Sequence, residues 1–324
     1  CVVGASGLVG SSIVRLALEK DYFVNGTLRD KSDISKVKYL TKLKNSHNLY
    51  LFDANMDNEK DFISPLQDTD AVFIACLTPT YKGKDGTPAK EMDDERGYKE
   101  IINPTVDGCL NIIKTAKYHN IKNVVICSST SSTNPVPPVK FKNEIDHWSD
   151  EKEQCRSKKY TSATKTVMEK AAIKYCEEND IRLSIILPTG LYGDPVLPSH
   201  LNHNPFIWLK RVIEGGNPRH EKIPNDSASM IHLRDLAKIF LAVYENPNAS
   251  GRYFGVYKSL HWYDIYNECR KLIPNMNMPI TFSDKPVEPT GFDFTRRDSL
   301  KVHIRDFSTT LKETINWLKT KPFE

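Results

Sequence analysis

The sequence opens with "CVVGASGLVG" (residues 1–10), and this stretch decides the fold. An apolar run ends at Val3 and predicts a strand, glycines then recur at every third position, and apolar side chains follow at helical spacing up to Leu18. Glycines in such a turn let a pyrophosphate approach the backbone, and the N-terminus of the next helix offers free N–H groups to that anion. Strand, turn and helix in this order predict a dinucleotide-binding unit. The residues expected to bind there are Gly4, Ser6, Gly7, Leu8, Val9 and Gly10.

The same alternation of strand and helix continues to about Pro188. Strands are expected at residues 22–29, 49–54, 71–76, 123–129 and 182–188, and helical patterns lie between them. This order predicts an α/β fold with a doubly wound parallel (Rossmann) sheet. Prolines and loops become frequent after Pro188, and an amphipathic helix near residues 232–247 is expected to return to the sheet. We therefore expect a cofactor domain over residues 1–188 with a return over about 228–250, and a smaller, discontinuous substrate lobe mainly over 189–324.

Composition argues against several classes of protein. The net charge is +4 over 324 residues, and acidic and basic residues interleave, which is untypical of nucleic-acid or membrane binding. No apolar run approaches the roughly 20 residues that span a bilayer. The seven cysteines are scattered without a C-x-x-C pair, so we expect free thiols in a cytoplasmic protein and no metal site. Cys1 falls inside an expected strand, so we expect a few residues before it.

The end of the second expected strand concerns the choice of nucleotide. An NAD-preferring site usually carries an acid there, whereas this chain has Arg29, followed by lysines at positions 31, 36 and 38. A guanidinium pairs well with a 2′-phosphate. Asp30 is a candidate for the acid role, and the basic residues are also compatible with a solvated face. We favour NADP(H) over NAD(H).

Several stretches together resemble one family. "CVVGASGLVG", "NPTVDGCLNIIK", "VVICSS", "TKTVMEKAA" and "ILPTGLYGD" are similar to the dihydroflavonol 4-reductase, anthocyanidin reductase and cinnamoyl-CoA reductase group of extended short-chain dehydrogenases/reductases, found mostly in plants. The resemblance covers nearly the whole chain and is weakest at about residues 80–98, 130–158 and after 275. It implies an NADPH-dependent reductase of a flat organic substrate, monomeric or homodimeric.

The resemblance also implies roles for individual residues. Ser129 and Lys165 match the catalytic serine and lysine, and Lys165 would also hold the nicotinamide ribose. Arg29 and Lys36 match residues at the 2′-phosphate, and Asn55, followed by Met56, stands where the family has an acid at the adenine. The residues that match the nicotinamide end of the site are Cys76, Leu77, Thr78, Pro188 and Thr189.

The catalytic tyrosine of the family is missing from its usual place. It lies four residues before the lysine, where this chain has Thr161, while Tyr160 lies five before. Residues four apart on a helix point about 40° apart and residues five apart about 140° apart, so Tyr160 needs a π-bulge to face the cofactor. An alkyl hydroxyl such as that of Thr161 is a poor general acid. Other candidates from loops are Tyr81, Tyr98, Tyr192 and His232.

Three functions remain open at this point. The first is an NADPH-dependent reductase of a plant-type specialised metabolite, such as a conjugated carbonyl, ketone or iminium. The second is a non-redox cyclase, isomerase or lyase on the same scaffold, which the threonine at position 161 favours. The third is a non-catalytic NADP(H)-binding subunit, against which Ser129 and Lys165 argue. Aromatic residues in 205–211 and 261–268 suit either a flat substrate or the core of the lobe.

Overall fold

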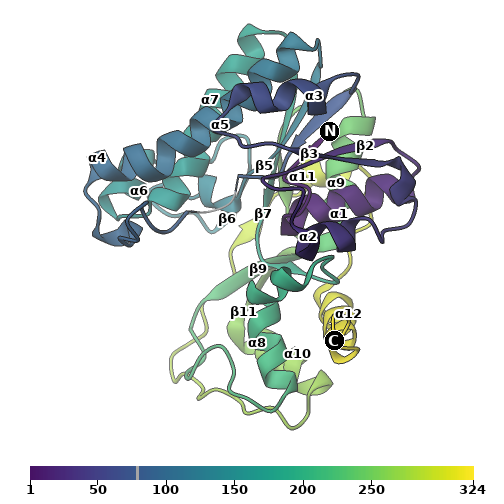
Figure 1. Cartoon of the computed structure of the whole chain (residues 1–324). Coiled ribbons are helices and arrows are strands. Elements are labelled where there is room, and N and C mark those ends of the chain that lie inside the picture. Colours follow the sequence, from purple (N-terminus) through teal and green to yellow (C-terminus); the bar gives the residue numbers. More distant parts are fainter. Residues whose placement is uncertain (78–79) are drawn as a thin grey trace.

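The computed structural model describes residues 1–77 and 80–324. Among these residues, seven strands form one sheet in the order β10-β7-β5-β4-β1-β2-β3, and all neighbouring strands are parallel (Figure 1). The strand order reverses at β1, which has β2 on one side and β4 on the other. The predicted doubly wound parallel sheet is therefore confirmed. Its strands are β1 (Val2–Val3), β2 (Val24–Leu28), β3 (Leu49–Asp53), β4 (Ala71–Ile74), β5 (Asn123–Cys127), β7 (Arg182–Pro188) and β10 (Gly251–Gly255).

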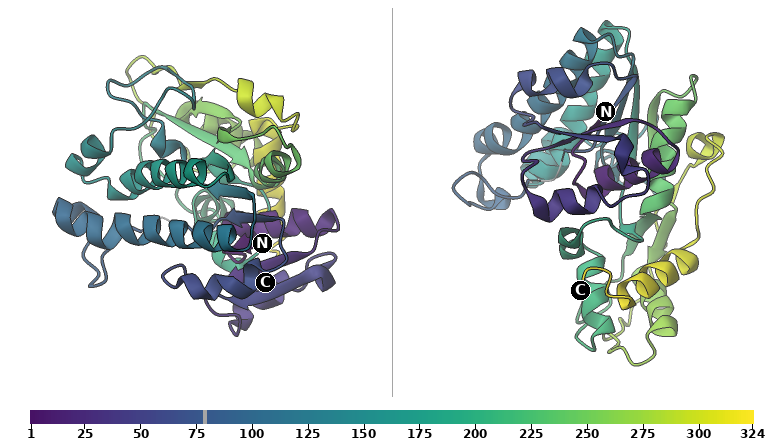
Figure 2. Two further views of the ribbon diagram at one scale, coloured as in Figure 1. Left: turned by 90° about the horizontal axis from the view of Figure 1, so that it is seen from above. Right: turned by 45° about the vertical axis from the view of Figure 1, so that its right-hand side comes forward.

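Helices cover both faces of the sheet. Helices α1 (Leu8–Glu19) and α9 (Leu233–Glu245) pack on one face and against each other. On the other face, α5 (Asn103–Tyr118) and α7 (Tyr160–Glu178) lie side by side (Figure 2). Successive strand residues enter different cores: Val2, Val125 and Ile186 join the α1 and α9 side, whereas the residues next to them join the α5 and α7 side. Strands buried on both faces explain the continuous apolar runs of the sequence.

Shorter elements connect these layers. A π turn, η4, precedes α5 directly. The elements of this group are α2 (Ile34–Leu40), α3 (Ile63–Leu66), α4 (Asp94–Gly97), α6 (Glu151–Arg156), η1 (Ser46–Asn48), η2 (Glu59–Phe62), η3 (Ala89–Glu91), η4 (Tyr98–Ile102) and η5 (Thr130–Ser132).

The lobe lies below the main sheet in the view of Figure 1 and has its own three-stranded sheet in the order β11-β9-β8. β6 and β12 form a separate two-stranded sheet. The elements after Pro188, together with β6, are β6 (Phe141–Lys142), β8 (Leu191–Tyr192), β9 (Ser227–His232), β11 (Lys258–His261), β12 (Gly291–Phe292), η6 (Pro198–Asn202), α8 (Phe206–Ile213), α10 (Trp262–Leu272), α11 (Thr295–Ser299) and α12 (Phe307–Lys319).

The aromatic residues of the lobe form its core. Trp208 on α8 and Trp262 and Tyr266 on α10 are buried in one apolar cluster with Leu311 and other residues of α12. Their packing therefore supports the second of the two expectations, that these aromatic residues form the core of the lobe.

The chain enters the lobe after β7 and returns to the main sheet through α9 and β10. Arg182, at the start of β7, donates hydrogen bonds of 2.7–2.9 Å to the carbonyls of Val243, Tyr244, Asn246 and Ala249. A cation there satisfies carbonyls that the end of a helix leaves unpaired. This contact fixes the return of the chain to the main sheet, and the chain enters the lobe again after β10 with β11, α10 and α12.

Candidate active site

The glycine turn brings α1 close to the ends of β1 and β4. Gly4 has a φ of +87°, and a Cβ added there would lie 2.8 Å from the Cα of Cys76. A Cβ on Gly10 would lie 2.1 Å from the carbonyl oxygen of Gly4. Glycine is needed at both positions because the backbones approach each other so closely.

A cavity of about 320 Å³ lies beside this turn, at the carboxyl ends of the strands. In open parallel sheets, ligands bind at this edge where the strand order reverses, which here is between β1 and β4. Eight of the residues expected at the dinucleotide line the cavity: Gly4, Ser6, Gly7, Arg29, Asn55, Met56, Cys76 and Leu77. Thr78 lies outside the described residues. The lining of this cavity does not include Leu8, Val9, Gly10, Lys36, Lys165, Pro188 and Thr189, within the described part of the chain.

The far end of the cavity carries the residues expected at the adenosine. Arg29 follows β2 directly and is exposed. Lys36 pairs with Asp33 at 2.7 Å, so it faces the start of α2. The carboxylate of Asp30 accepts hydrogen bonds from the hydroxyl and the amide of Ser32, which lower its pKa. Ser32 therefore engages Asp30, whereas Arg29 is among the residues that line the cavity.

Lys165 reaches the near end of the cavity from α7. Its ammonium is buried and donates a hydrogen bond of 2.6 Å to the carbonyl of Leu77, which lines the cavity. Burial lowers the pKa of Lys165, although the neighbouring Cys127 and Glu169 oppose that change. One turn earlier, the hydroxyl of Thr161 donates to the carbonyl of Thr80 at 2.6 Å. Thr161 and Lys165 thus contact the segment after β4 from one face of α7.

Ser129 lies just after β5, near the same edge of the sheet. Its side-chain oxygen accepts a hydrogen bond of 3.2 Å from the amide of Ser131 and so caps η5. The hydroxyl proton of Ser129 is free to point elsewhere, because this bond uses only a lone pair.

Tyr160 points away from the cavity. Its hydroxyl donates to Asp94 at 2.6 Å and accepts from the ammonium of Lys158 at 3.1 Å. Its ring is fully buried against Gly97, where an added Cβ would lie 2.4 Å from it. All residues of α7 are described and form a regular α-helix, and the π turn of this region is η4. The geometry therefore supports a packing role for Tyr160.

Three of the four candidates expected from loops lie in other elements, Tyr98 in η4, Tyr192 in β8 and His232 in β9, and their side chains make contacts there. Tyr98 donates to Glu151 at 2.8 Å, and Tyr192 packs against Phe307 in the core of the lobe. His232 caps α9, accepting from the amide of Arg234 at 3.1 Å. Tyr81 is 67% exposed.

A buried ion pair beside the site was missed by the sequence analysis. Glu169, four residues after Lys165 on α7, is fully buried and accepts from Nε of Arg252 at 2.8 Å and from the hydroxyl of Ser128. Burial raises the pKa of Glu169, and Arg252 opposes that rise. The guanidinium also stacks on Trp148 at 3.6 Å. The only local signal was an acid within an otherwise apolar helix face, "TVMEKAA".

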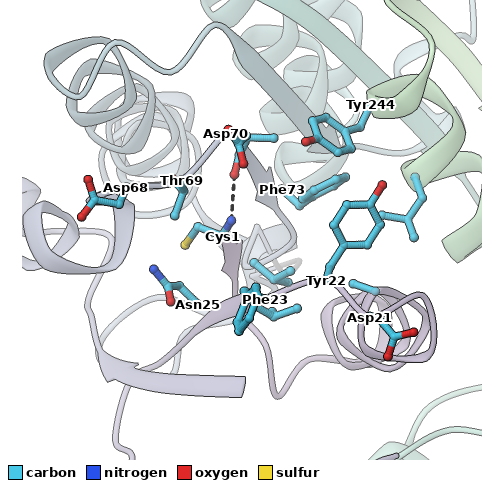
Figure 3. A pocket seen from close by; sticks show the side chains of 15 residues that line it. Cys1, Asp21, Tyr22, Phe23, Asn25, Asp68, Thr69, Asp70, Phe73 and Tyr244 are labelled. Atoms are coloured by element: carbon cyan, nitrogen blue, oxygen red, sulfur yellow. Dashed lines mark hydrogen bonds between the residues drawn. The ribbon is translucent and has the colours of Figure 1, made fainter. Parts of the chain in front are cut away.

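A second cavity, of about 410 Å³, lies at the amino ends of the strands, and Cys1, Tyr22, Phe23 and Tyr244 are among the residues that line it (Figure 3). The main-chain nitrogen of Cys1 donates to the carbonyl of Ala71 at 2.7 Å beside it. We place the candidate site in the cavity at the carboxyl edge, since ligands of this fold bind there.

In the described ranges, no three histidine, cysteine or acidic residues are grouped as metal ligands. The described helices include none with the length and apolar character to cross a membrane.

Comparisons with known proteins agree with this geometry. The chain is 32% identical over 330 residues to cinnamoyl-CoA reductase CAD2 of Medicago truncatula, covering 100% of this chain and 96% of the relative. It is also 32% identical over 300 residues to the bifunctional dihydroflavonol 4-reductase/flavanone 4-reductase of Malus domestica, covering 90% and 82%. Yeast methylglyoxal/isovaleraldehyde reductase Gre2, solved in complex with NADPH, shares the fold with a TM-score of 0.78 at 20% identity, covering 99% and 98%.

The family model matches residues 1–256. The resemblance expected from the sequence is confirmed by this match and by the curated relatives. The chain belongs to the NAD dependent epimerase/dehydratase family.

Proposed function

We propose that this oxidoreductase is an NADPH-dependent reductase of a plant-type specialised metabolite, a conjugated carbonyl, ketone or iminium compound. The observation that carries the proposal is the buried ammonium of Lys165, which lies 2.6 Å from the carbonyl oxygen of Leu77 at the edge of the cavity beside the glycine turn. An ammonium is costly to bury, so its position at this edge supports a role toward a bound ligand. The reductase activities named for the curated relatives support the same class of reaction.

The chain's own residues fit a dinucleotide along the cavity. Bound NADPH would supply a hydride. The glycine turn, from Gly4 to Gly10, would take the pyrophosphate at the N-terminus of α1, and Arg29 with Lys36 would take the 2′-phosphate. Asn55 and Met56 would lie at the adenine. The nicotinamide end would be held by Cys76, Leu77, Thr78, Lys165, Pro188 and Thr189.

Proton supply is the unusual step. Ser129 would donate a hydrogen bond to the substrate oxygen, and Lys165 would stabilise negative charge that develops there. Thr161 would orient a water or the substrate and not act as the acid itself. Conjugated carbonyl and iminium compounds need less acid assistance, because the proton can arrive from solvent after hydride transfer. Thr161 therefore favours these substrates over simple ketones.

A second candidate is a non-redox cyclase, isomerase or lyase on this scaffold. It is supported by the expectation, from the family resemblance, that Thr161 stands where the family has its tyrosine, and by the hydroxyl of Thr161 donating to the carbonyl of Thr80. The third, a non-catalytic NADP(H)-binding subunit, is disfavoured because packing alone does not offset the burial of Lys165. In all three cases we propose a cytoplasmic monomer or homodimer, with residues 1–188 and 228–250 binding the cofactor and 189–324 forming most of the substrate lobe.

The test is a fluorescence titration of the protein with NADPH and with NADH. We expect tighter binding of NADPH, and a loss of about tenfold in Arg29→Ala, because one charge-assisted pair is worth roughly 1.5–3 kcal/mol. Binding of NADH should be unchanged in that variant. Lys42→Ala removes an exposed charge of the same sign outside the cavity lining and serves as the control. If neither nucleotide binds, the reductase proposal is rejected.

A turnover assay then separates the first two candidates. NADPH oxidation is followed with a dihydroflavonol, an anthocyanidin and cinnamoyl-CoA as probes, using the wild type, Thr161→Tyr and Thr161→Phe. The tyrosine variant should reduce the dihydroflavonol ketone at least tenfold faster than the phenylalanine variant, because a general acid contributes about 10²–10⁴ in rate. Equal rates in the two variants would argue against a reductase site at Thr161.

A further inference from the structure

A segment of the lobe runs along α1 back to the glycine turn. This strap, residues 193–200, follows β8 and includes the first residues of η6. Its first contact is Asp194, whose carboxylate pairs with Arg15 of α1 at 3.1 Å and with Arg234 of α9 at 2.8 Å. Arg15 also donates to the main-chain carbonyl of Asp194 at 2.9 Å. One end of the strap is therefore fixed to the middle of α1.

The other end of the strap contacts the glycine turn itself. Nε2 of His200 lies 3.0 Å from the carbonyl oxygen of Ser6. Nδ1 of the same ring accepts from the amide of Leu197 at 3.3 Å, so the proton of the neutral ring belongs on Nε2, which donates to Ser6. The side chain is 3% exposed, and burial lowers its pKa to about 4. His200 is thus a neutral donor in one fixed tautomer at neutral pH.

The middle of the strap is apolar and buried. Val196 and Leu197 belong to the same core cluster as Ala5 of the turn and Ile13 of α1. The strap therefore contacts the turn and α1 by two polar ends and an apolar centre.

The contact with Ser6 has a consequence for the shape of the turn. The carbonyl of Ser6 and the amide of Gly7 belong to one planar peptide group, so fixing the carbonyl also fixes the direction of the N–H. That N–H donates to the carbonyl of Gly4 at 2.9 Å and closes the turn. His200, Ser6, Gly7 and Gly4 are therefore connected by two hydrogen bonds through a single rigid peptide.

We propose that His200 is a positioning residue for dinucleotide binding: from the lobe, it holds the Ser6–Gly7 peptide that closes the turn, and so orients the free N–H groups at the start of α1 that would receive the pyrophosphate. The inference rests on the proposed function, since it assumes that a dinucleotide occupies the cavity. It assigns the strap to cofactor affinity and not only to lobe structure.

The test compares His200→Leu and His200→Gln by NADPH titration. Leucine keeps an apolar volume in the buried site and removes the donor, whereas the amide of glutamine can still donate to Ser6. We expect about tenfold weaker binding in His200→Leu, equal to about 1.4 kcal/mol, and less than about threefold in His200→Gln. His203→Leu, at the exposed residue that directly follows η6, is the matched control and should bind as the wild type does.

The outcomes separate this inference from the proposed function. If the wild type binds neither nucleotide, both fail. If the wild type binds NADPH and His200→Leu binds equally well, even with a lower melting temperature, only the positioning role is rejected. Equal losses in the leucine and glutamine variants also reject it, because ring shape would then matter and not the hydrogen bond. Adenosine 2′-monophosphate lacks the pyrophosphate, so its affinity should fall in Arg29→Ala and not in His200→Leu.

A measurement on the wild type keeps the inference testable if His200→Leu does not fold. Hydrogen–deuterium exchange is followed with and without NADPH. Peptides from residues 193–203 should exchange more slowly with NADPH, while peptides from α10, in the core of the lobe, should not change. Unchanged exchange in 193–203 would overturn the inference.

Discussion

Gly4 needs to be glycine for two reasons, its backbone angle and its close approach to Cys76, and a comparison with Gly86 separates them. Its φ of +87° disfavours any side chain, and a Cβ would also lie 2.8 Å from Cys76. Gly86 has nearly the same φ, +85°, but a Cβ there meets nothing within 4 Å. The pair therefore distinguishes the cost of the backbone angle from the cost of the close approach.

We expect Gly86→Ala to lower the free energy of unfolding by about 1 kcal/mol and Gly4→Ala by at least about 3 kcal/mol, because only the second also forces two backbones apart. Urea denaturation of both variants measures the difference. Equal losses would show that the approach of β1 to Cys76 relaxes without cost.

The positions of residues could be predicted from the sequence where they depend on local order. The glycines of the turn and Lys165 fall at fixed distances from recognisable strands and helices. The hydrogen bonds of Tyr160 and His200 could not be predicted, because Asp94 and Ser6 lie 66 and 194 residues away in the chain. Helical spacing indicated only that Tyr160 and Lys165 point in different directions.

At the scale of elements, α7 is joined to β10 by the ion pair of Glu169 and Arg252. The guanidinium also donates to the carbonyls of Glu144 and His147 at 2.8 and 3.1 Å, and so fixes the loop before α6. Ser128, next to Ser129, donates to the same glutamate. This pair thus connects the helix that carries Lys165 with the loop that carries Ser129.

We expect Glu169→Met to lower the free energy of unfolding by about 3–5 kcal/mol, because it leaves the buried charge of Arg252 without a partner. Adding Arg252→Met should cost little more, or should recover stability, since no uncompensated charge then remains. Urea denaturation of the two single variants and the double variant measures this coupling. Additive losses would mean that the two side chains act independently.

Strands could be predicted as apolar runs, but their neighbours could not. Residues 251–255 fall in the range expected mainly for the lobe, whereas β10 (Gly251–Gly255) pairs with β7 at the edge of the main sheet. The π turn η4 was not expected either. Both depend on contacts with distant segments, which a local pattern of side chains does not encode.

At the scale of the whole molecule, two buried histidines lie where the lobe meets the cofactor domain. His200 contacts the glycine turn, and Nε2 of His232, at the start of α9, lies 3.3 Å from Glu313 of α12. Burial lowers the pKa of both to about 4, and Arg305 adds to the effect at His232. Both rings are therefore neutral in the native protein near pH 7, and the contact with Glu313 is not an ion pair there.

This arrangement predicts acid sensitivity at the junction. An unfolded histidine has a pKa of about 6.5, so between about pH 6.5 and 4 the unfolded chain binds more protons than the native one, and stability falls as the pH falls. The contribution of the two neutral rings to the free energy of unfolding is fully present above about pH 6.5. At pH 5 each histidine should cost about 2 kcal/mol relative to pH 7.5.

Urea denaturation at pH 7.5 and 5.0 measures this loss, and the double variant His200→Gln/His232→Gln isolates it. Acidic groups also lie at or near the junction: Asp194, Asp235 and Glu313 face His232, and burial raises the pKa of Glu144 and of Glu169. Because the double variant keeps all of these carboxyl groups, the difference in pH dependence between it and the wild type reports chiefly on the imidazoles. The variant should be less stable at pH 7.5 and lose less on acidification. The same pH dependence in both proteins would mean that acid acts through the carboxyl groups and that the junction is not its target.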